Sequence, residues 1–473
     1  MSHICRVFCV VLLILTFVLP CMAGISGGAA ERPNIVLFIC DDMTWSDAGC
    51  YGSEDAKTPN LDKLASQGMK FNRCFTSTAM CAPTRQQLYT GLWPVRSGAY
   101  PNHSAVKAGT RSLGHHFADQ GYRVALSGKK HYKPAASYPF EFLGGHKQDD
   151  LNFPAIKEFM TRKADEPYFL ICATFQPHGP WTMGDRSAYD PAKLKLPDYL
   201  ADTSETREAL ADYLAEVTHM DMLLGKVIAQ LEEAGQADNT IFLFTSEQGN
   251  GLPFAKWTCY EAGLKTGLIV RWPGKVKAGS TTDAMVQYVD IVPTLLDAVG
   301  SDPKEIDTGL GGAPGDGKGF DGRSFLPVLF EQQELHRHYV FGIHTTRGII
   351  NGSKSYPIRS IRGKRYKLIA NLNHETAFSN IAMSETFWKS WVKAAEAGDM
   401  RAQQAVDRYT HRPAYELYDL QADPNELNNL AGKRALTEVQ ARLKRQLEAW
   451  MEQQGDEGNA TEMKVKAHKS TQK

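Results

Sequence analysis

The chain has 473 residues, of which 42% are hydrophobic, so it is long enough to bury the core of a large domain and a smaller one. Lys plus Arg and Asp plus Glu both number 53, which gives a formal net charge of zero. This balance argues against non-specific nucleic-acid binding, which needs an excess of basic side chains to displace counterions. An anion bound by this protein must therefore be held by a local cluster of cations.

The first residues have the pattern of a secretory signal peptide. Arg6 is followed by an apolar run, Phe8–Leu19, which is too short for a membrane span of about 20 residues. Cys21–Ala23 then offers a cleavage site before Gly24. We therefore expect residues 1–23 to be removed and the protein to be secreted or periplasmic, without stable membrane insertion. An uncleaved N-terminal anchor is the alternative.

Three of the nine cysteines lie in this signal segment. The others contain no Cys-x-x-Cys pair, so a zinc site is not expected. In an oxidising compartment some of them could form disulfides, whose pairing the sequence does not determine. These cysteines are Cys40, Cys50, Cys74, Cys81, Cys172 and Cys259.

Apolar strand-like runs alternate with helical segments in the first part of the chain. Asn34–Cys40 is almost entirely Ile, Val, Leu and Phe, as expected of a strand buried on both faces. This alternation predicts an α/β fold in which a large, mostly parallel sheet is sandwiched by helices. The further strands are expected at Tyr122–Leu126, Tyr168–Ala173 and Thr240–Phe244, and helices at Leu61–Gln67, Ser112–Gln120 and Thr206–Ala234.

The character of the sequence changes near His336. The Gly-rich stretch Gly309–Gly319 predicts a surface loop before this point. Short strand-like segments, Tyr366–Ile369 and Glu416–Leu420, then bracket polar helical stretches, which indicates a smaller α+β domain. The chain beyond Gln454 is polar and Lys-rich, as in a disordered tail. The expected boundaries are 31–335 for the large domain, 336–454 for the smaller one and 455–473 for the tail.

Polar side chains directly follow each of the expected buried strands. Ligands of an open parallel sheet bind outside the carboxyl ends of its strands, so these side chains converge if the strands share one sheet. Carboxylates and amides suit a hard cation such as calcium or magnesium, and Lys suits a tetrahedral oxyanion. Each segment alone could equally be a turn, a helix cap or an ordinary loop. The segments are Asp41-Asp42, Ser127–His131, Gln176–Pro180 and Thr245–Gly249.

The segment Cys81–Gly91 predicts a reactive cysteine at the start of a helix. Pro83 favours the first turn of a helix and Gly91 its end. Cys81 would then lie at the helix N-terminus, where the dipole lowers a thiol pKa. Arg85 follows one turn later on the same face and could hold an anion beside it. A structural cysteine, buried or in a disulfide, is the alternative.

This segment resembles the signature of the type I sulfatases of the alkaline phosphatase superfamily. Their pattern is Cys-x-Pro-Ser/Thr-Arg followed by Leu-x-Thr-Gly, with Thr84 here in place of the commoner Ser. In that family a maturation enzyme oxidises the cysteine to Cα-formylglycine, whose aldehyde hydrate is the nucleophile. The resemblance covers nearly the whole mature chain. Further matching segments are Pro33–Asp42, Tyr51-Gly52, Thr58–Ala65, Gly128–His131, Pro177–Pro180, Asp321–Phe325, Glu416–Leu420 and Asp423-Pro424.

The resemblance implies one calcium ion per chain. Its ligands would be Asp41, Asp42, Glu247 and Gln248, with a hydroxyl of matured Cys81 close to the ion. Many relatives have Asp-Asn or Asp-His where this chain has Glu247-Gln248. Both side chains retain an oxygen, so we expect the metal to be retained. An altered or lost site is the alternative.

The resemblance also assigns catalytic roles. Arg85 would stabilise the hydrate, and Lys129 would bridge it to the sulfate. His178 or Lys256 would stabilise or protonate the leaving oxygen. His131 would then take a proton from the remaining hydroxyl, which releases sulfate and restores the aldehyde. Candidates for lining the substrate pocket are Trp181, Trp257, His103, His344 and Arg347.

Taken together, the motifs predict an exported sulfatase, a sulfuric ester hydrolase. Its substrate would be a sulfated carbohydrate, such as a glycosaminoglycan or an algal polysaccharide, with an N-sulfate or an aryl sulfate as alternatives. Its other partner would be the maturation enzyme. Two other functions remain open: a phosphate or phosphonate monoester hydrolase of the same superfamily, and a catalytically inactive protein that binds sulfated glycans.

Overall fold

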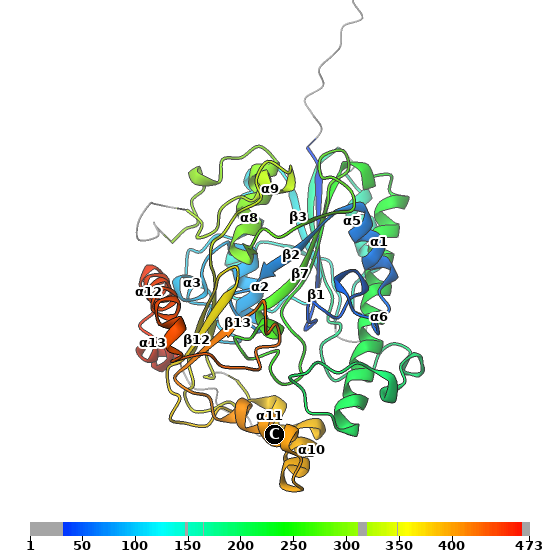
Figure 1. Ribbon diagram of the computed structural model, residues 1–473. Helices are drawn as coiled ribbons and strands as arrows, with labels where there is room; N and C mark the ends of the chain where they lie inside the picture. The colour runs from blue at the N-terminus through cyan, green and yellow to red at the C-terminus, as the bar shows by residue number, and fades with distance from the viewer. Residues whose placement is uncertain (1–31, 147–149, 164, 311–318, 348, 466–473) are drawn as a thin grey trace, which may run out of the picture. The chain divides into compact units, whose positions relative to one another are not determined.

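A computed structural model describes residues 32–146, 150–163, 165–310, 319–347 and 349–465. The expected signal peptide and most of the Gly-rich stretch therefore lie outside the described residues. The described chain forms a nine-stranded sheet and a separate four-stranded sheet (Figure 1). No helix in these ranges has the length and apolar character to span a membrane. All of the cysteines in these ranges are free thiols, so no disulfide joins them.

The large sheet has the strand order β4-β3-β5-β1-β6-β7-β2-β8, and β9 pairs with β2. Strands β3, β5, β1 and β6 run parallel, whereas β7 is antiparallel to both of its neighbours. The predicted α/β fold with a mostly parallel sheet is therefore confirmed. The strands are β1 Asn34–Cys40, β2 Met69–Phe75, β3 Arg123–Gly128, β4 Glu141–Phe142, β5 Tyr168–Ala173, β6 Thr240–Ser246, β7 Lys265–Arg271, β8 Ser280–Thr282 and β9 Val286–Gln287.

The central strand β1 explains why helices cover both faces of this sheet. All of its residues are buried. Val36 and Phe38 belong to one hydrophobic core, and Ile35 and Leu37 belong to another, because successive side chains of a strand point to opposite faces. Each face therefore needs its own layer of helices to exclude water.

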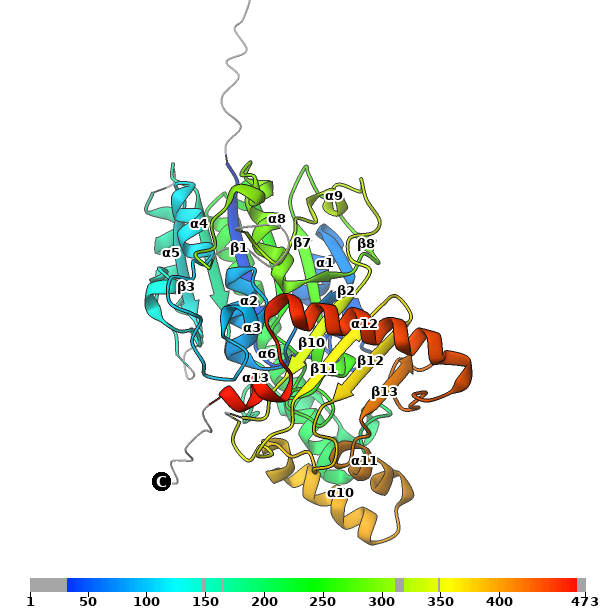
Figure 2. The ribbon, with the colours of Figure 1, turned by 90° about the vertical axis from the view of Figure 1, so that its left-hand side faces the viewer.

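Helices α1, α5 and α6 pack on the face of Val36, and α2, α4 and α8 pack on the face of Ile35 (Figure 1, with α4 labelled in Figure 2). Helix α6 begins earlier than the apolar pattern predicts because the Thr203 side chain caps it by accepting a hydrogen bond from the Thr206 N–H. The helices of this part are α1 Pro59–Gln67, α2 Cys81–Thr90, α3 Pro94–Ser97, α4 Leu113–Asp119, α5 Phe153–Thr161, α6 Ser204–Glu233, α7 Glu261–Leu264, α8 Ile291–Ala298 and α9 Leu326–Leu329.

The smaller sheet is antiparallel, in the order β10-β11-β12-β13, and the long helix α12 lies across it (Figure 2). Leu443, Leu447 and Trp450 of α12 share a hydrophobic core with Ile361 and Leu368 of the sheet. The elements are β10 Val340–His344, β11 Ile358–Arg362, β12 Tyr366–Asn371, α10 Thr386–Glu396, α11 Met400–Thr410, β13 Tyr415–Asp419, α12 Thr437–Gln454 and α13 Asn459–Lys464.

The C-terminal segment is ordered farther than the sequence predicts. The sequence predicts a disordered tail from residue 455, but Asp456 is buried and its carboxylate accepts a hydrogen bond of 2.9 Å from Arg359. Breaking a buried ion pair costs folding free energy. The pair of Asp456 with Arg359 therefore holds the chain in place beyond Gln454. Helix α13 follows, with Glu462 buried. Residues 466–473 lie outside the described residues.

Candidate active site

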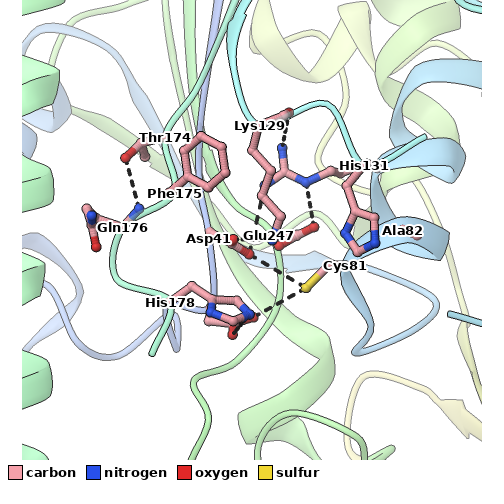
Figure 3. A network of polar contacts seen from close by, with 12 residues as sticks. Asp41, Cys81, Ala82, Lys129, His131, Thr174, Phe175, Gln176, His178 and Glu247 are labelled. Carbon is pink, nitrogen blue, oxygen red and sulfur yellow. Dashed lines mark hydrogen bonds and ion pairs between the residues drawn. The ribbon is translucent and has the colours of Figure 1, made fainter. Parts of the chain in front are cut away.

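The carboxyl ends of β1, β3, β5 and β6 meet at one edge of the large sheet and bring the expected site residues together (Figure 3). Backbone hydrogen bonds continue past the strands and fix the loops. The Asp41 N–H donates to the Gln176 carbonyl at 2.9 Å, and the Lys129 N–H donates to the Ala173 carbonyl at 2.7 Å. The Glu247 N–H donates to the carbonyl of Cys40, the last residue of β1, at 2.8 Å.

The turn from β3 to Lys129 requires glycine. Gly128 has φ +93°, and a Cβ at this position would lie 2.0 Å from the carbonyl oxygen of Ala173. His131 and His103 also have left-handed backbones, with φ of +44° and +60°, and their Nε2 and Nδ1 atoms lie 2.8 Å apart. Non-glycine residues in this conformation are strained and concentrate at functional sites.

Cys81 is the first residue of α2, as the sequence predicts. Gly91 ends the helix with φ +68°, and its N–H donates to the Gln87 carbonyl. Every residue of α2 is buried. The Thr84 hydroxyl lies 3.0 Å from that of Thr76, so the threonine that replaces the commoner serine fits here and is hydrogen bonded.

An acidic cluster surrounds the thiol. Asp41, Asp42, Cys81 and Glu247 are buried, and one possible ligand atom from each lies within 4.8 Å of the others. The Cys81 Sγ is 3.7 Å from Asp41 Oδ1 and 3.8 Å from Asp42 Oδ1. Gln248 Nε2 donates to Asp42 Oδ1, while the buried Oε1 of Gln248 has no hydrogen-bond partner among the described residues. Hard oxygen donors with one oxygen left unsatisfied fit a calcium ion.

Arg85 forms a buried ion pair below the thiol. Its Nε donates to Glu247 Oε1 at 2.7 Å, and both side chains are 0% exposed. Burial alone would lower the pKa of Arg85, but Glu247 and Asp41 raise it, so the guanidinium stays charged. Burial raises the pKa of Glu247 well above its usual value in spite of Arg85. The two directions conflict, and the 2.7 Å contact to a charged guanidinium favours the ionised form of Glu247, so Glu247 is the ion-pair partner of Arg85.

Two ammonium groups set the charge of the thiol. Lys129 pairs with Asp41, and Lys256 Nζ lies 2.6 Å from Asp42 Oδ2. Burial alone would raise the pKa of Cys81, but Lys129 and Lys256 lower it well below its usual value. The site therefore favours an anion at this position.

His178 is placed to donate a proton. Its Nε2 lies 3.5 Å from Asp42 Oδ2, and its Nδ1 lies 2.7 Å from the Gly179 carbonyl oxygen. Lys256 and burial both lower the pKa of His178, but Asp42 and Asp41 outweigh them and raise it. The imidazolium form of His178 is therefore more stable here than it would be in water.

The site opens into a cavity of about 500 Å³. Trp181, Trp257 and His103 line it, as the sequence suggests. His344 and Arg347 do not, which corrects the sequence interpretation. His344 lies fully buried at the end of β10, and the Arg347 Nε donates to a backbone carbonyl of the C-terminal segment at 2.7 Å. His344 therefore packs within the smaller sheet, and Arg347 holds the C-terminal segment.

Part of the cavity wall was missed by sequence reasoning. It comes from three loops, the short 3-10 helix Ile381–Ser384 and the start of α10, where no helical or strand period marks a buried face. One feature of the sequence could have indicated this wall: two adjacent Ile residues within a polar, Gly-containing loop. The missed lining residues are Asn102, Gly251, Ile349, Ile350, Ile381, Ala382, Glu385 and Phe387.

The large sheet has an alkaline phosphatase-like fold, with a nucleophile, acidic side chains and lysines gathered at its carboxyl edge. The family model "Sulfatase" matches residues 33–301, and the model "N-sulphoglucosamine sulphohydrolase, C-terminal" matches residues 249–385 and 400–453. The chain belongs to the sulfatase family and is a sulfuric ester hydrolase.

Two relatives match over most of their own length and are named as sulfatases. An ulvan-active sulfatase of Formosa agariphila is 31% identical over 91% of this chain and 82% of its own. The N-sulphoglucosamine sulphohydrolase of Homo sapiens is 30% identical over 90% of this chain and 91% of its own. Among solved structures, one in complex with its substrate D-glucosamine-2-N,6-O-disulfate has a TM-score of 0.66 at 20% identity, covering 90% of this chain and 99% of that one.

Proposed function

We propose that this protein hydrolyses a sulfate ester of a sulfated carbohydrate, with a formylglycine made from Cys81 as nucleophile. One observation carries the proposal. Cys81 begins a buried helix, lies between two aspartates and two lysines, and forms the floor of a cavity. The relatives support the substrate class, because they are named for ulvan and for N-sulphoglucosamine.

The maturation of Cys81 remains a proposal that rests on its motif and its surroundings. Thr84 sits in a hydrogen-bonded position next to Thr76, so it does not disturb the start of α2. A maturation enzyme acting before folding would find the full signature, Cys81–Gly91, in the extended chain. We further propose that residues 1–23 direct export to a secreted or periplasmic location.

Calcium is the proposed metal. Asp41, Asp42, Glu247 and Gln248 would hold it, with the matured Cys81 beside them. When bound, calcium would stabilise the negative charge on the sulfate oxygens and on the nucleophile. The longer Glu247 and Gln248 side chains place their polar atoms in the same cluster as the aspartates, which supports retention of the metal.

The remaining roles follow from where the side chains lie. Lys129 and Lys256 line the cavity beside Cys81, so they would bind the sulfate oxygens. His178, with its raised pKa, would protonate the oxygen of the departing alcohol. His131, which faces the same cavity and contacts His103, would take up the proton that is lost when the sulfate is released.

The first test is a mass spectrum of the exported protein, produced together with its maturation enzyme. The tryptic peptide with Cys81 is expected to be about 18 Da lighter than the thiol form, because SH and a hydrogen are replaced by an aldehyde oxygen. The same spectrum is expected to show a chain that begins at Gly24. A peptide with the unmodified thiol would contradict the formylglycine, and a chain with residues 1–23 attached would contradict cleavage.

Turnover separates the remaining functions. We expect the matured protein to hydrolyse an aryl sulfate faster than the matched aryl phosphate. A preference for the phosphate would favour the phosphate or phosphonate monoester hydrolase. Tight binding of a sulfated glycan without turnover, in a matured protein supplied with calcium, would favour the inactive binder.

Calcium removal gives a further prediction. Adding calcium to chelator-treated protein is expected to raise the unfolding temperature, because an ion that binds only the folded state stabilises it, by about 2.7 kcal/mol at a concentration of 100 times Kd. Differential scanning fluorimetry measures this without any turnover. Gln248→Leu, which leaves the charge unchanged, should show a smaller calcium effect. An unfolding temperature that is indifferent to calcium would argue for a lost metal site.

A further inference from the structure

The apolar part of the cavity wall adjoins the reaction centre. Met80, Trp257 and Ile349 form one hydrophobic cluster, and Ile381 packs against it. Met80 immediately precedes Cys81 in the chain. Trp257, Ile349 and Ile381 line the same cavity as Cys81, so a molecule whose sulfate reaches Cys81 can rest an apolar face against them. Such a wall suits the apolar face of a ring.

The cations of the cavity are already engaged at its floor. Lys129 is paired with Asp41, and Lys256 is paired with Asp42. Among the described residues, the cavity lining includes no arginine and no other lysine. The reacting sulfate would use these two ammonium groups. The wall formed by Trp257, Ile349, Ile381, Glu385 and Phe387, here called the outer cavity, offers no Lys or Arg to a second sulfate or to a carboxylate.

The outer cavity carries a carboxylate instead. Glu385 lines it and is exposed to solvent. It is the residue that precedes α10, but its side chain makes no capping hydrogen bond and has no ion pair among the described residues. Its charge is therefore available to a bound molecule. A carboxylate at this place attracts an ammonium or a hydroxyl group and repels an anion.

We propose that Glu385 determines specificity. In addition to the reacting sulfate, the outer cavity selects a substrate with a hydrogen-bond donor, preferably an ammonium group, and disfavours one with a second sulfate or a carboxylate. The inference rests on the proposed function, because it concerns the substrate of the same site. It narrows the substrate class to sulfated carbohydrates in which the polar group near the reacting sulfate is neutral or cationic.

The phenolic sulfate esters of tyramine, tyrosol and p-hydroxyphenylacetate test this, since they share a phenyl sulfate core and differ mainly in the charge of the side chain. We expect kcat/KM for the tyramine ester to exceed that for the p-hydroxyphenylacetate ester by about tenfold at low salt, mainly through KM. Added salt should reduce this ratio. Glu385→Gln should bring it close to one, and Glu385→Lys should reverse it.

Glu396→Gln is the matched control. Glu396 is an exposed glutamate at the other end of α10 and does not line the cavity, so this substitution makes the same charge change elsewhere. It should keep the wild-type ratio. Glu385 does not set specificity if the kcat/KM ratio is near one in the wild type. The same conclusion follows if Glu385→Gln and Glu396→Gln change the ratio equally.

Binding separates this inference from the proposed function. Calorimetry with the Cys81→Ala variant gives the affinity of each ester without turnover. Equal affinities overturn the role of Glu385 whether or not the wild type is active. Affinities in the expected order, with no turnover by matured wild-type protein, overturn the proposed hydrolysis and support the role of Glu385.

Discussion

Replacing Cys81 by Ala is expected to lower kcat/KM by at least about 10³-fold, because the nucleophile is lost while the cavity remains. The Cys81 thiol makes only long polar contacts, to Gln248 Nε2 at 3.6 Å and to the two carboxylates at 3.7 and 3.8 Å, so the fold does not depend on it. We therefore expect an unchanged circular dichroism spectrum. The measurement is turnover of an aryl sulfate by wild type and variant, each checked by mass for its state at residue 81.

The Cys81→Ser variant tests whether release of sulfate needs the aldehyde hydrate, which carries two hydroxyl groups on one carbon. In this variant, kept unmodified at residue 81, the serine oxygen attacks sulfur, the bond from sulfur to the alcohol breaks, and the serine proton passes to the alcohol. The enzyme should gain about 80 Da and stop, because serine has no second hydroxyl on Cβ whose deprotonation expels sulfate. Cys50→Ala, which removes a half-buried thiol outside the cavity, should retain activity. Sustained turnover by the unmodified serine variant would refute the formylglycine mechanism.

The buried pair Arg85–Glu247 is expected to give the second largest effect. Arg85→Gln leaves Glu247 without its cation, and Glu247→Gln leaves Arg85 only the longer contact to Asp41, at 3.8 Å. At full burial each change is expected to cost about 3–5 kcal/mol of unfolding free energy. The double variant removes both charges and should lose less than the sum of the two single variants, by about 1–3 kcal/mol. Urea unfolding in the presence of a chelator measures these values, because bound calcium would otherwise compensate Glu247.

The same variants should also lose activity, by about 10²-fold or more, since Arg85 and Glu247 hold the cluster around Cys81. An exposed pair serves as control: Lys157 and Glu233 lie 2.9 Å apart with side chains 56% and 59% exposed. Neutralising that pair should change neither stability nor activity appreciably, because solvent screens it. Strictly additive losses at Arg85 and Glu247 would show that the two charges do not depend on each other.

Much of the large domain could be predicted because its signals are local. Asn34–Cys40 is apolar at nearly every position, which only a strand covered on both faces tolerates. The helix from Cys81 is marked by Pro83 and Gly91, whose backbone preferences act within a few residues. Polar residues at the strand ends then follow from the topology of a parallel sheet.

The features that were missed depend on residues far apart in the chain. Asp456 looks like part of a polar tail until the fold brings Arg359 to it and buries both. His344 resembles a pocket residue by type, yet its position in β10 turns it into the interior. Glu385 is one of many charged residues, and only its placement in the wall of the cavity distinguishes it.

The sequence by itself determined the α/β class, the buried strands, the reactive Cys81 with Arg85 one turn away, and the membership suggested by the ordered motifs. These features depend on backbone preferences and on the periodicity of apolar side chains, both of which can be read from a short stretch of sequence. Only the tertiary structure decided that Arg85 pairs with Glu247, that both lysines are bound to aspartates, and that the outer cavity is apolar with one carboxylate. Pairing of charges and the shape of a cavity depend on burial, and burial is a property of the folded chain.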